Sequence, residues 1–160
     1  MVIVVRYLAL AALTVWLGSM SVLGLLIVPA IGRALQPADG HLLSGGVLSE
    51  ILRLFHLLAY ACGAVLLICL FVIKFVGPPP RAFKLRAALV AVMLAIALYS
   101  GIPLAREMFA MQPRAAGSVS GLSDPDARRT RFDRLHATAA TLLAINVALG
   151  FVLLSWYVRE

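Results

Sequence analysis

Four long apolar runs dominate the pattern of hydrophobic and polar positions along the chain. None of them contains Asp, Glu, Lys or Arg, and each reaches the roughly 18 to 20 residues that an α-helix needs to cross a hydrocarbon core of about 30 Å. The runs extend from Tyr7 to Gly32, Leu54 to Ile73, Ala87 to Ala105 and Leu135 to Val158. We predict four membrane spans, at about residues 7–33, 47–74, 84–106 and 128–158, within a single domain, 1–160.

Short or moderate polar connections separate these spans, so successive helices should run in opposite directions. The fold class that this predicts is an all-α membrane protein, an antiparallel up-down-up-down four-helix transmembrane bundle. The connections are expected at 33–46, 74–86 and 112–123, with a capped helix start at 123–126. Pro29 and Pro103 stand near the ends of the first and third spans, where a missing N–H should loosen the last turns.

Composition supports a membrane protein. Hydrophobic residues make up 62% of the 160 residues and charged residues only 13%, with a mean hydropathy of +1.00. The N-terminal run has no early basic cluster, is too long for the apolar part of a signal peptide and lacks a small-residue cleavage pattern, so we expect it to stay on the mature protein. Cys62 and Cys69 lie in the second span, where thiols usually act as small core hydrophobes.

The net charge of +7 arises from 14 Lys and Arg against 7 acids, and these charges fall in connections and helix ends. Lipid head groups therefore explain the charge better than nucleic acid, which we exclude as a partner. The second connection carries Lys74, Arg81, Lys84 and Arg86 without an acid. By the positive-inside rule we expect a multi-pass protein of the cell membrane with cytoplasmic termini.

The candidate site begins with Glu50, Arg53 and His56, which share one helix face because they are three residues apart. The predicted topology brings further polar residues of the other spans to the same membrane face. The candidate binding residues are Glu50, Arg53, His56, Arg106, Arg134, His136 and Asn146. Ionisable groups within a span are costly and usually functional, so we expect the cluster to bind or pass a small polar solute or ion. The structural alternative is an interfacial ion pair beside a histidine that serves packing.

Two other functions remain open. His56 and His136 would suit the axial ligands of a haem b in an electron-transfer subunit, with arginines near the propionates. Alternatively, the charged face docks a second copy or another subunit of a membrane complex, which makes the chain an accessory structural protein. No hydrolytic triad, phosphate loop or convincing metal-ligand spacing points to an enzyme, and no cofactor other than this haem is indicated.

Several short motifs occur in a recognisable order. The first span contains W-x-G (Trp16, Gly18) and ends with Val-Pro (Val28, Pro29), and Ala-x-Gly (Ala38, Gly40) follows. The last span opens with F-x-x-x-H (Phe132, His136) and carries Asn146. In this order the chain resembles the transmembrane-protein-205-like family of small four-span membrane proteins. That resemblance implies the same four-span fold; the activity of the family is not established, and its eukaryotic namesake is linked to drug resistance.

Two departures accompany this resemblance. The chain has Val-Pro-Ala-Ile where the family often has an aromatic residue after Val-Ala-Pro, and Ala137 and Thr138 follow the histidine where Gly-Ser is common. The first span and the intramembrane histidines are also reminiscent of copper-resistance D and related haem-handling membrane families.

Overall fold

The computed structural model describes residues 2–30, 40–76, 82–111 and 127–158, and these residues are almost entirely helical. The elements are α1 (Val2–Val22), the π-helical turn η1 (Leu23–Ile27), α3 (Gly40–Val76), α4 (Phe83–Tyr99), the π-helical turn η2 (Ser100–Leu104), α5 (Ala105–Met111) and α6 (Ala127–Val158). Four stretches are long and apolar enough to cross a membrane, at Val2–Ala30, Ser49–Val76, Phe83–Met108 and Thr130–Val158. The four-helix membrane bundle predicted from the apolar runs is therefore confirmed.

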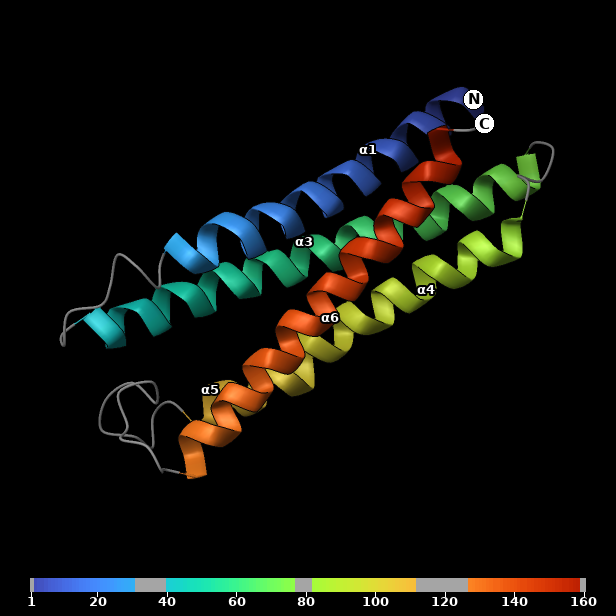
Figure 1. Ribbon diagram of the computed structural model, residues 1–160. Coiled ribbons are helices and arrows are strands. Elements are labelled where there is room, and N and C mark those ends of the chain that lie inside the picture. The colour runs from blue at the N-terminus through green and yellow to red at the C-terminus, as the bar shows by residue number, and fades with distance from the viewer. Residues whose placement is uncertain (1, 31–39, 77–81, 112–126, 159–160) are drawn as a thin grey trace.

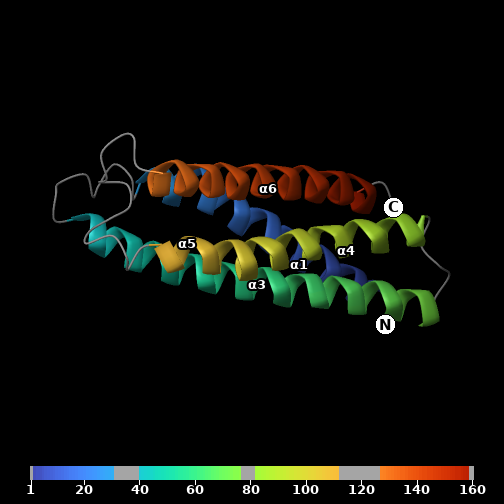
Figure 2. The same ribbon diagram turned by 90° about the horizontal axis from the view of Figure 1, so that it is seen from below.

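The helices run up, down, up and down (Figure 1). α1 begins at the same end of the bundle at which α6 finishes, and α3 passes into α4 at that end as well. α3 packs against α1 and α4, and α6 packs against the same two helices from another side (Figure 2). α3 and α6 consequently occupy opposite corners of the bundle.

The core is a narrow stripe on each helix, whose buried positions recur every three or four residues. These positions are Leu13, Trp16 and Met20 on α1, Ala59, Leu66 and Leu70 on α3, Val90, Met93 and Ala97 on α4, and Asn146 and Leu153 on α6. Cys62 and Cys69 are buried free thiols, as expected. Large apolar residues outside the stripe, such as Leu25 and Ile68, are exposed and available to lipid.

Pro29 and Pro103 each lie close to or within a π-helical turn. η1 ends two residues before Pro29, and η2 contains Pro103. Proline cannot donate to the carbonyl of the preceding turn, and a wider turn accommodates that loss. The expected loosening near the ends of the first and third spans is thus confirmed.

The structure corrects two expected connections. α3 already begins at Gly40, so the second half of the connection expected at 33–46 is helical. The connection expected at 74–86 is shorter, because α3 extends to Val76 and α4 begins at Phe83. Arg86 therefore lies in α4, and it is buried. The connection at 112–123 and the helix cap at 123–126 fall outside the described residues.

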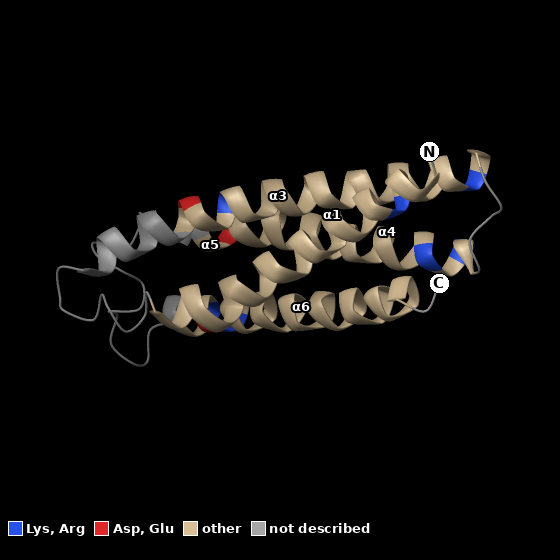
Figure 3. Cartoon of the chain, turned by 90° about the horizontal axis from the view of Figure 1, so that it is seen from above, with Lys and Arg blue, Asp and Glu red and all other residues tan. Residues whose placement is uncertain are grey.

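Charged residues gather at the two ends of the bundle and leave its middle uncharged (Figure 3). At one end the described charged residues are all basic. We call it the basic end, with Arg6, Lys74, Lys84 and Arg86. The described acids all lie at the opposite end, the polar end, which holds Glu50, Arg53, Arg106, Glu107, Arg131, Asp133, Arg134 and His136.

Candidate functional site

His56 is one of two predicted site residues that make a polar contact between helices, and Asn146 is the other. It lies on α3 and is half-buried. Its Nδ1 lies 2.7 Å from the carbonyl oxygen of Leu52, one turn earlier, and its Nε2 lies 3.2 Å from Ser100 Oγ at the start of η2. Ser100 Oγ is also 3.2 Å from the carbonyl oxygen of Ala97. Both ring nitrogens of His56 therefore take part in hydrogen bonds.

A glycine allows α3 and η2 to approach each other here. A Cβ built on Gly101 would overlap Tyr60 Oη and would lie 2.5 Å from His56 Cδ2. Tyr60 in turn donates its hydroxyl proton to the carbonyl of Ala97, over 3.4 Å. Because glycine is small, three polar side chains and one backbone carbonyl can meet at the break in the third span.

Aromatic rings flank the imidazole along α3. Phe55 meets it edge-on, with ring centroids 5.4 Å apart, and the Tyr60 ring is tilted against it at 6.2 Å. These contacts hold the ring in one orientation and shield one part of it from lipid. The imidazole can therefore keep Nδ1 and Nε2 on their partners.

Glu50 and Arg53 form an ion pair on the exposed surface of α3. Arg53 donates from Nε to Glu50 Oε2 over 2.9 Å and from Nη2 to Glu50 Oε1 over 2.6 Å. This is the interfacial pair that the structural alternative anticipated. Exposed pairs of this kind contribute little to stability, so the pair mainly fixes the two side chains at the membrane edge.

A second ion pair at the polar end joins two helices. Arg131 on α6 donates to Glu107 on α5, and both side chains are partly or largely exposed. This pairing could not be predicted from the sequence, because the two residues belong to different helices and lie 24 positions apart. It ties the start of the fourth span to the end of the third.

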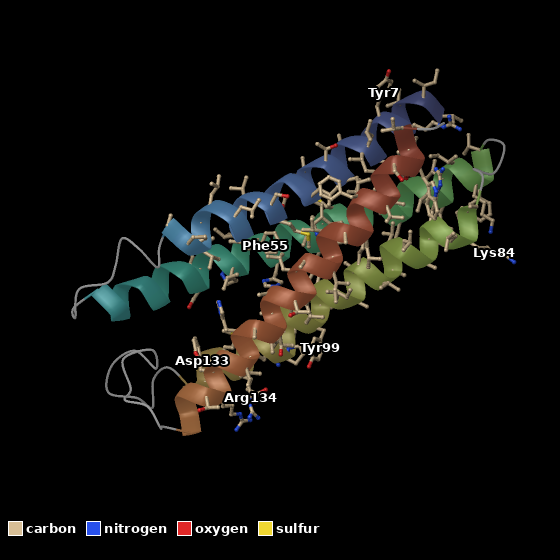
Figure 4. All side chains as sticks on the ribbon, in the orientation of Figure 1. Tyr7, Phe55, Lys84, Tyr99, Asp133 and Arg134 are labelled. Carbon is tan, nitrogen blue, oxygen red and sulfur yellow. The ribbon has the colours of Figure 1, made fainter. Side chains whose placement is uncertain are left out.

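The remaining candidates are dispersed. Arg106 and Arg134 are exposed, and Figure 4 labels Arg134 with Asp133 in the first turns of α6. His136 is also exposed and stacks on Phe132, with centroids 6.4 Å apart and an interplanar angle of 13°. Across the described part of the chain, no hydrogen bond or ion pair connects His56 with Arg53, Arg134 or His136.

Asn146 lies deeper in the bundle and is 1% exposed. Its Nδ2 donates to the carbonyl oxygen of Met93 over 3.1 Å, which fixes the amide orientation because a carbonyl can only accept. Among the described residues, its Oδ1 has no hydrogen-bond partner. Asn146 thus links α6 to α4 one turn away from the Ala97 carbonyl.

His56 was predicted as a site residue from the sequence, whereas its contact with Ser100 was not. The roles of Tyr60 and Gly101 were missed. Small residues beside a proline in an apolar run are the signal that points to Gly101. The described residues contain no group of three or more His, Cys, Asp or Glu that could hold a metal ion.

This arrangement can do two things chemically. The imidazole and the Ser100 hydroxyl can donate and accept hydrogen bonds or exchange protons, whereas the arginines of the polar end can bind anionic or polar groups.

Comparisons with protein family models, characterised proteins and solved structures found no match to this chain. The chain is an integral membrane protein with four spans, on the grounds of its helices alone.

Proposed function

We propose that the protein binds or passes a small polar solute or ion, which enters at the polar end and reaches His56. The observation that supports this most is the contact of His56 with Ser100, at the point where the third span departs from α-helical geometry. An ionisable side chain within a span is expensive to keep there. A functional role of His56 best explains why the chain keeps an ionisable side chain at this position.

The resemblance to the transmembrane-protein-205-like family belongs to this proposal. Four spans of the observed lengths fit such proteins, and Trp16 of the W-x-G motif is completely buried against Gly63. Gly18 of the same motif is exposed. The motif therefore supports packing of the first span at Trp16.

Charge supports an orientation with both termini in the cytoplasm of the cell. Each described charged residue of the basic end is a Lys or Arg, and this is the end where α1 starts and α6 finishes. The short connection between α3 and α4 is basic and contains no acid, and basic residues of short connections favour the cytoplasmic side. The polar end then faces outward, so a solute would reach His56 from outside the cell.

The decisive experiment measures solute entry into liposomes that contain the purified protein. The probes are glycerol and urea, followed by light scattering, and a potassium chloride or pH gradient, followed by a pH-sensitive dye. We expect at least one probe to enter about tenfold faster than into protein-free liposomes. Arg53→Leu and His56→Leu should each reduce entry to the protein-free rate, because they remove the cation of the exposed Glu50–Arg53 pair and the imidazole that contacts Ser100.

Thr141→Leu serves as the matched control, since Thr141 is exposed on α6 and bonds only to its own helix at the Ala137 carbonyl. It should retain the wild-type rate. Full activity in both site variants would refute the site, and a wild-type protein no faster than empty liposomes for every probe would refute the function.

The same preparation distinguishes the haem alternative. A haem between α3 and α6 would require His56 Nε2 to leave Ser100 and the exposed His136 ring to leave Phe132. We therefore favour solute handling. A Soret absorption band after expression with ample haem, lost in His56→Leu, would replace this proposal with electron transfer.

A further inference from the structure

Three successive polar contacts at His56 connect α3 with the third span. They run from the Leu52 carbonyl to His56 Nδ1 (2.7 Å), from His56 Nε2 to Ser100 Oγ (3.2 Å), and from Ser100 Oγ to the Ala97 carbonyl (3.2 Å). Each of the three needs one hydrogen atom to be a hydrogen bond. The two carbonyl oxygens at the ends can only accept, so all the hydrogens must come from the imidazole and the hydroxyl.

Counting hydrogens shows what the neutral side chains can supply. A neutral imidazole carries one N–H and serine one O–H, which fill two of the three contacts. The Nδ1 hydrogen belongs to the Leu52 contact, because a bare Nδ1 would face an oxygen lone pair at 2.7 Å. Ser100 must then donate either to His56 Nε2 or to the Ala97 carbonyl, but not to both.

We propose that His56 and Ser100 form a proton-binding site within the membrane bundle. A second proton on the imidazole supplies the missing hydrogen: Nε2–H donates to Ser100 Oγ, whose own hydrogen turns to the Ala97 carbonyl. Binding of one proton therefore makes His56 the donor and Ser100 the acceptor, and all three contacts become hydrogen bonds. The proton adds to the Nε2 lone pair without breaking any covalent bond, and it leaves by the same atom.

Among the described residues, few charged groups lie close enough to His56 to oppose the binding of this proton. On α3, Tyr60 faces the ring, and the nearest charged residues are the mutually paired Glu50 and Arg53. From the third span, η2 brings Ser100, and Arg106 and Glu107 follow on α5. The described charged residues of α1 and α4 lie at the basic end, and the titratable groups of α6 near the polar end are Arg131, Asp133, Arg134 and His136.

A membrane cannot easily hold a buried positive charge, so the proton should be bound and released rather than kept. That behaviour suits a site through which protons pass. The identification of the proton as the transported ion rests on the proposed function, whereas proton binding itself does not. Ser100 is a positioning residue in this scheme, because it acts through His56.

The test is a pH titration of the ring nitrogens by NMR, on ¹⁵N-histidine-labelled full-length protein in lipid nanodiscs. Signals of His56 are assigned by their loss in His56→Gln. In the wild type we expect a neutral ring protonated at Nδ1 at about pH 9, converting to imidazolium as the pH falls to about 5. In Ser100→Ala, half-conversion should need an about tenfold higher proton concentration, because the acceptor for Nε2–H is gone.

Ser19→Ala is the matched control. Ser19 Oγ donates to the carbonyl three residues back, at Trp16, as Ser100 does to Ala97, but no imidazole adjoins it. It should titrate like the wild type, and Ser100→Thr should recover the wild-type midpoint by keeping the hydroxyl. If Ser100→Ala does not fold, two other results test the inference. Ser100→Thr must titrate with the same midpoint as the wild type, and the neutral His56 ring must carry its hydrogen on Nδ1.

A His56 ring that stays neutral throughout, or that titrates identically with and without the Ser100 hydroxyl, would overturn this inference. The liposome experiment answers separately: His56 that titrates as expected in a protein that passes none of the probes would refute the proposed function and leave the proton-binding site standing.

Discussion

Arg86, near the start of α4, is a buried cation that lies beside the last turn of α6. It stands in a basic stretch after three prolines, which predicts an exposed loop cation, yet it is 3% exposed. Its guanidinium lies 5.2 Å from the centre of the Tyr157 ring and donates to the Trp156 carbonyl over 3.4 Å. A cation beside the last turn of a helix is favoured by the carbonyls gathered there. These partners lie 70 positions away, so local sequence could not reveal them.

Ala82, at the start of α4, is strained. It is the one non-glycine residue with a positive φ in the described part of the chain, at 56°, and its carbonyl accepts hydrogen bonds from the N–H groups of Leu85 and Arg86. The left-handed conformation costs an alanine about 1–2 kcal/mol, because its Cβ crowds the following carbonyl.

We predict that Ala82→Gly stabilises the protein by about 1 kcal/mol, since glycine adopts this conformation without the steric cost and loses part of the gain to chain entropy. Thermal unfolding in detergent measures the effect. Ala61→Gly is the control, at an exposed position in the middle of α3, and should destabilise by about 0.5–1 kcal/mol. Loss of stability in both variants would mean that Ala82 is not strained.

At the scale of the helix, the sequence predicted the spans well and their orientation poorly. Length and apolarity suffice to define a span, because the bilayer sets both. They do not show which face turns inward, since lipid and protein core are equally apolar and no polar stripe marks the outside. Asn146 was predicted only as a candidate binding residue, and its buried contact with the Met93 carbonyl emerged from the structure. The contact of the His56 ring with Ser100 could not be predicted, because it depends on the rotation of the third span about its own axis.

Some glycines lie where two helices pack closely, and others face open space. A Cβ on Gly63 would lie 2.8 Å from Leu94 Cδ1 and 3.3 Å from two ring atoms of the buried Trp16, whereas a Cβ on Gly18 meets nothing within 4 Å. The two glycines therefore have opposite consequences when they are replaced, although both lie inside apolar helices.

We predict that Gly63→Ala destabilises the bundle by about 1–3 kcal/mol, because Trp16 and Leu94 must move to admit the methyl group. Gly18→Ala, the matched control, should be neutral or stabilising by up to about 1 kcal/mol through its better helix propensity. Unfolding of both variants in the same detergent compares them. Equal losses of stability would show that α1 and α3 do not pack through Gly63 as described.

At the scale of the whole molecule, the order of spans alone predicted which residues share an end. Each span reverses the direction of the chain, so Glu50, Glu107 and Asp133 were expected at the same end of the bundle. The described acids do lie at that end (Figure 3). The particular pairing of Glu107 with Arg131 could not be derived in this way, because it depends on how far the helices rotate and where α5 begins.

The arrangement predicts that both ends of the chain lie on one side of the membrane. A reporter that is active only in the cytoplasm, fused after Val158 or before Val2 in separate proteins, should be active in both. A reporter inserted in the connection between α1 and α3 should be inactive. Activity at only one terminus would contradict the even number of spans, and the reverse pattern in all three fusions would invert the proposed orientation.

The π-helical turn η2 amounts to a one-residue insertion into the third span. Each residue turns an α-helix by about 100°, so everything after an extra residue is re-aimed by that angle. Glu107 lies three positions beyond η2 and owes its meeting with Arg131 to this offset. A variant that lacks one residue of η2 after Ser100 would straighten the span and turn Glu107 away from α6. We expect tolerance of single-residue deletions to be lower here than anywhere else along the third span.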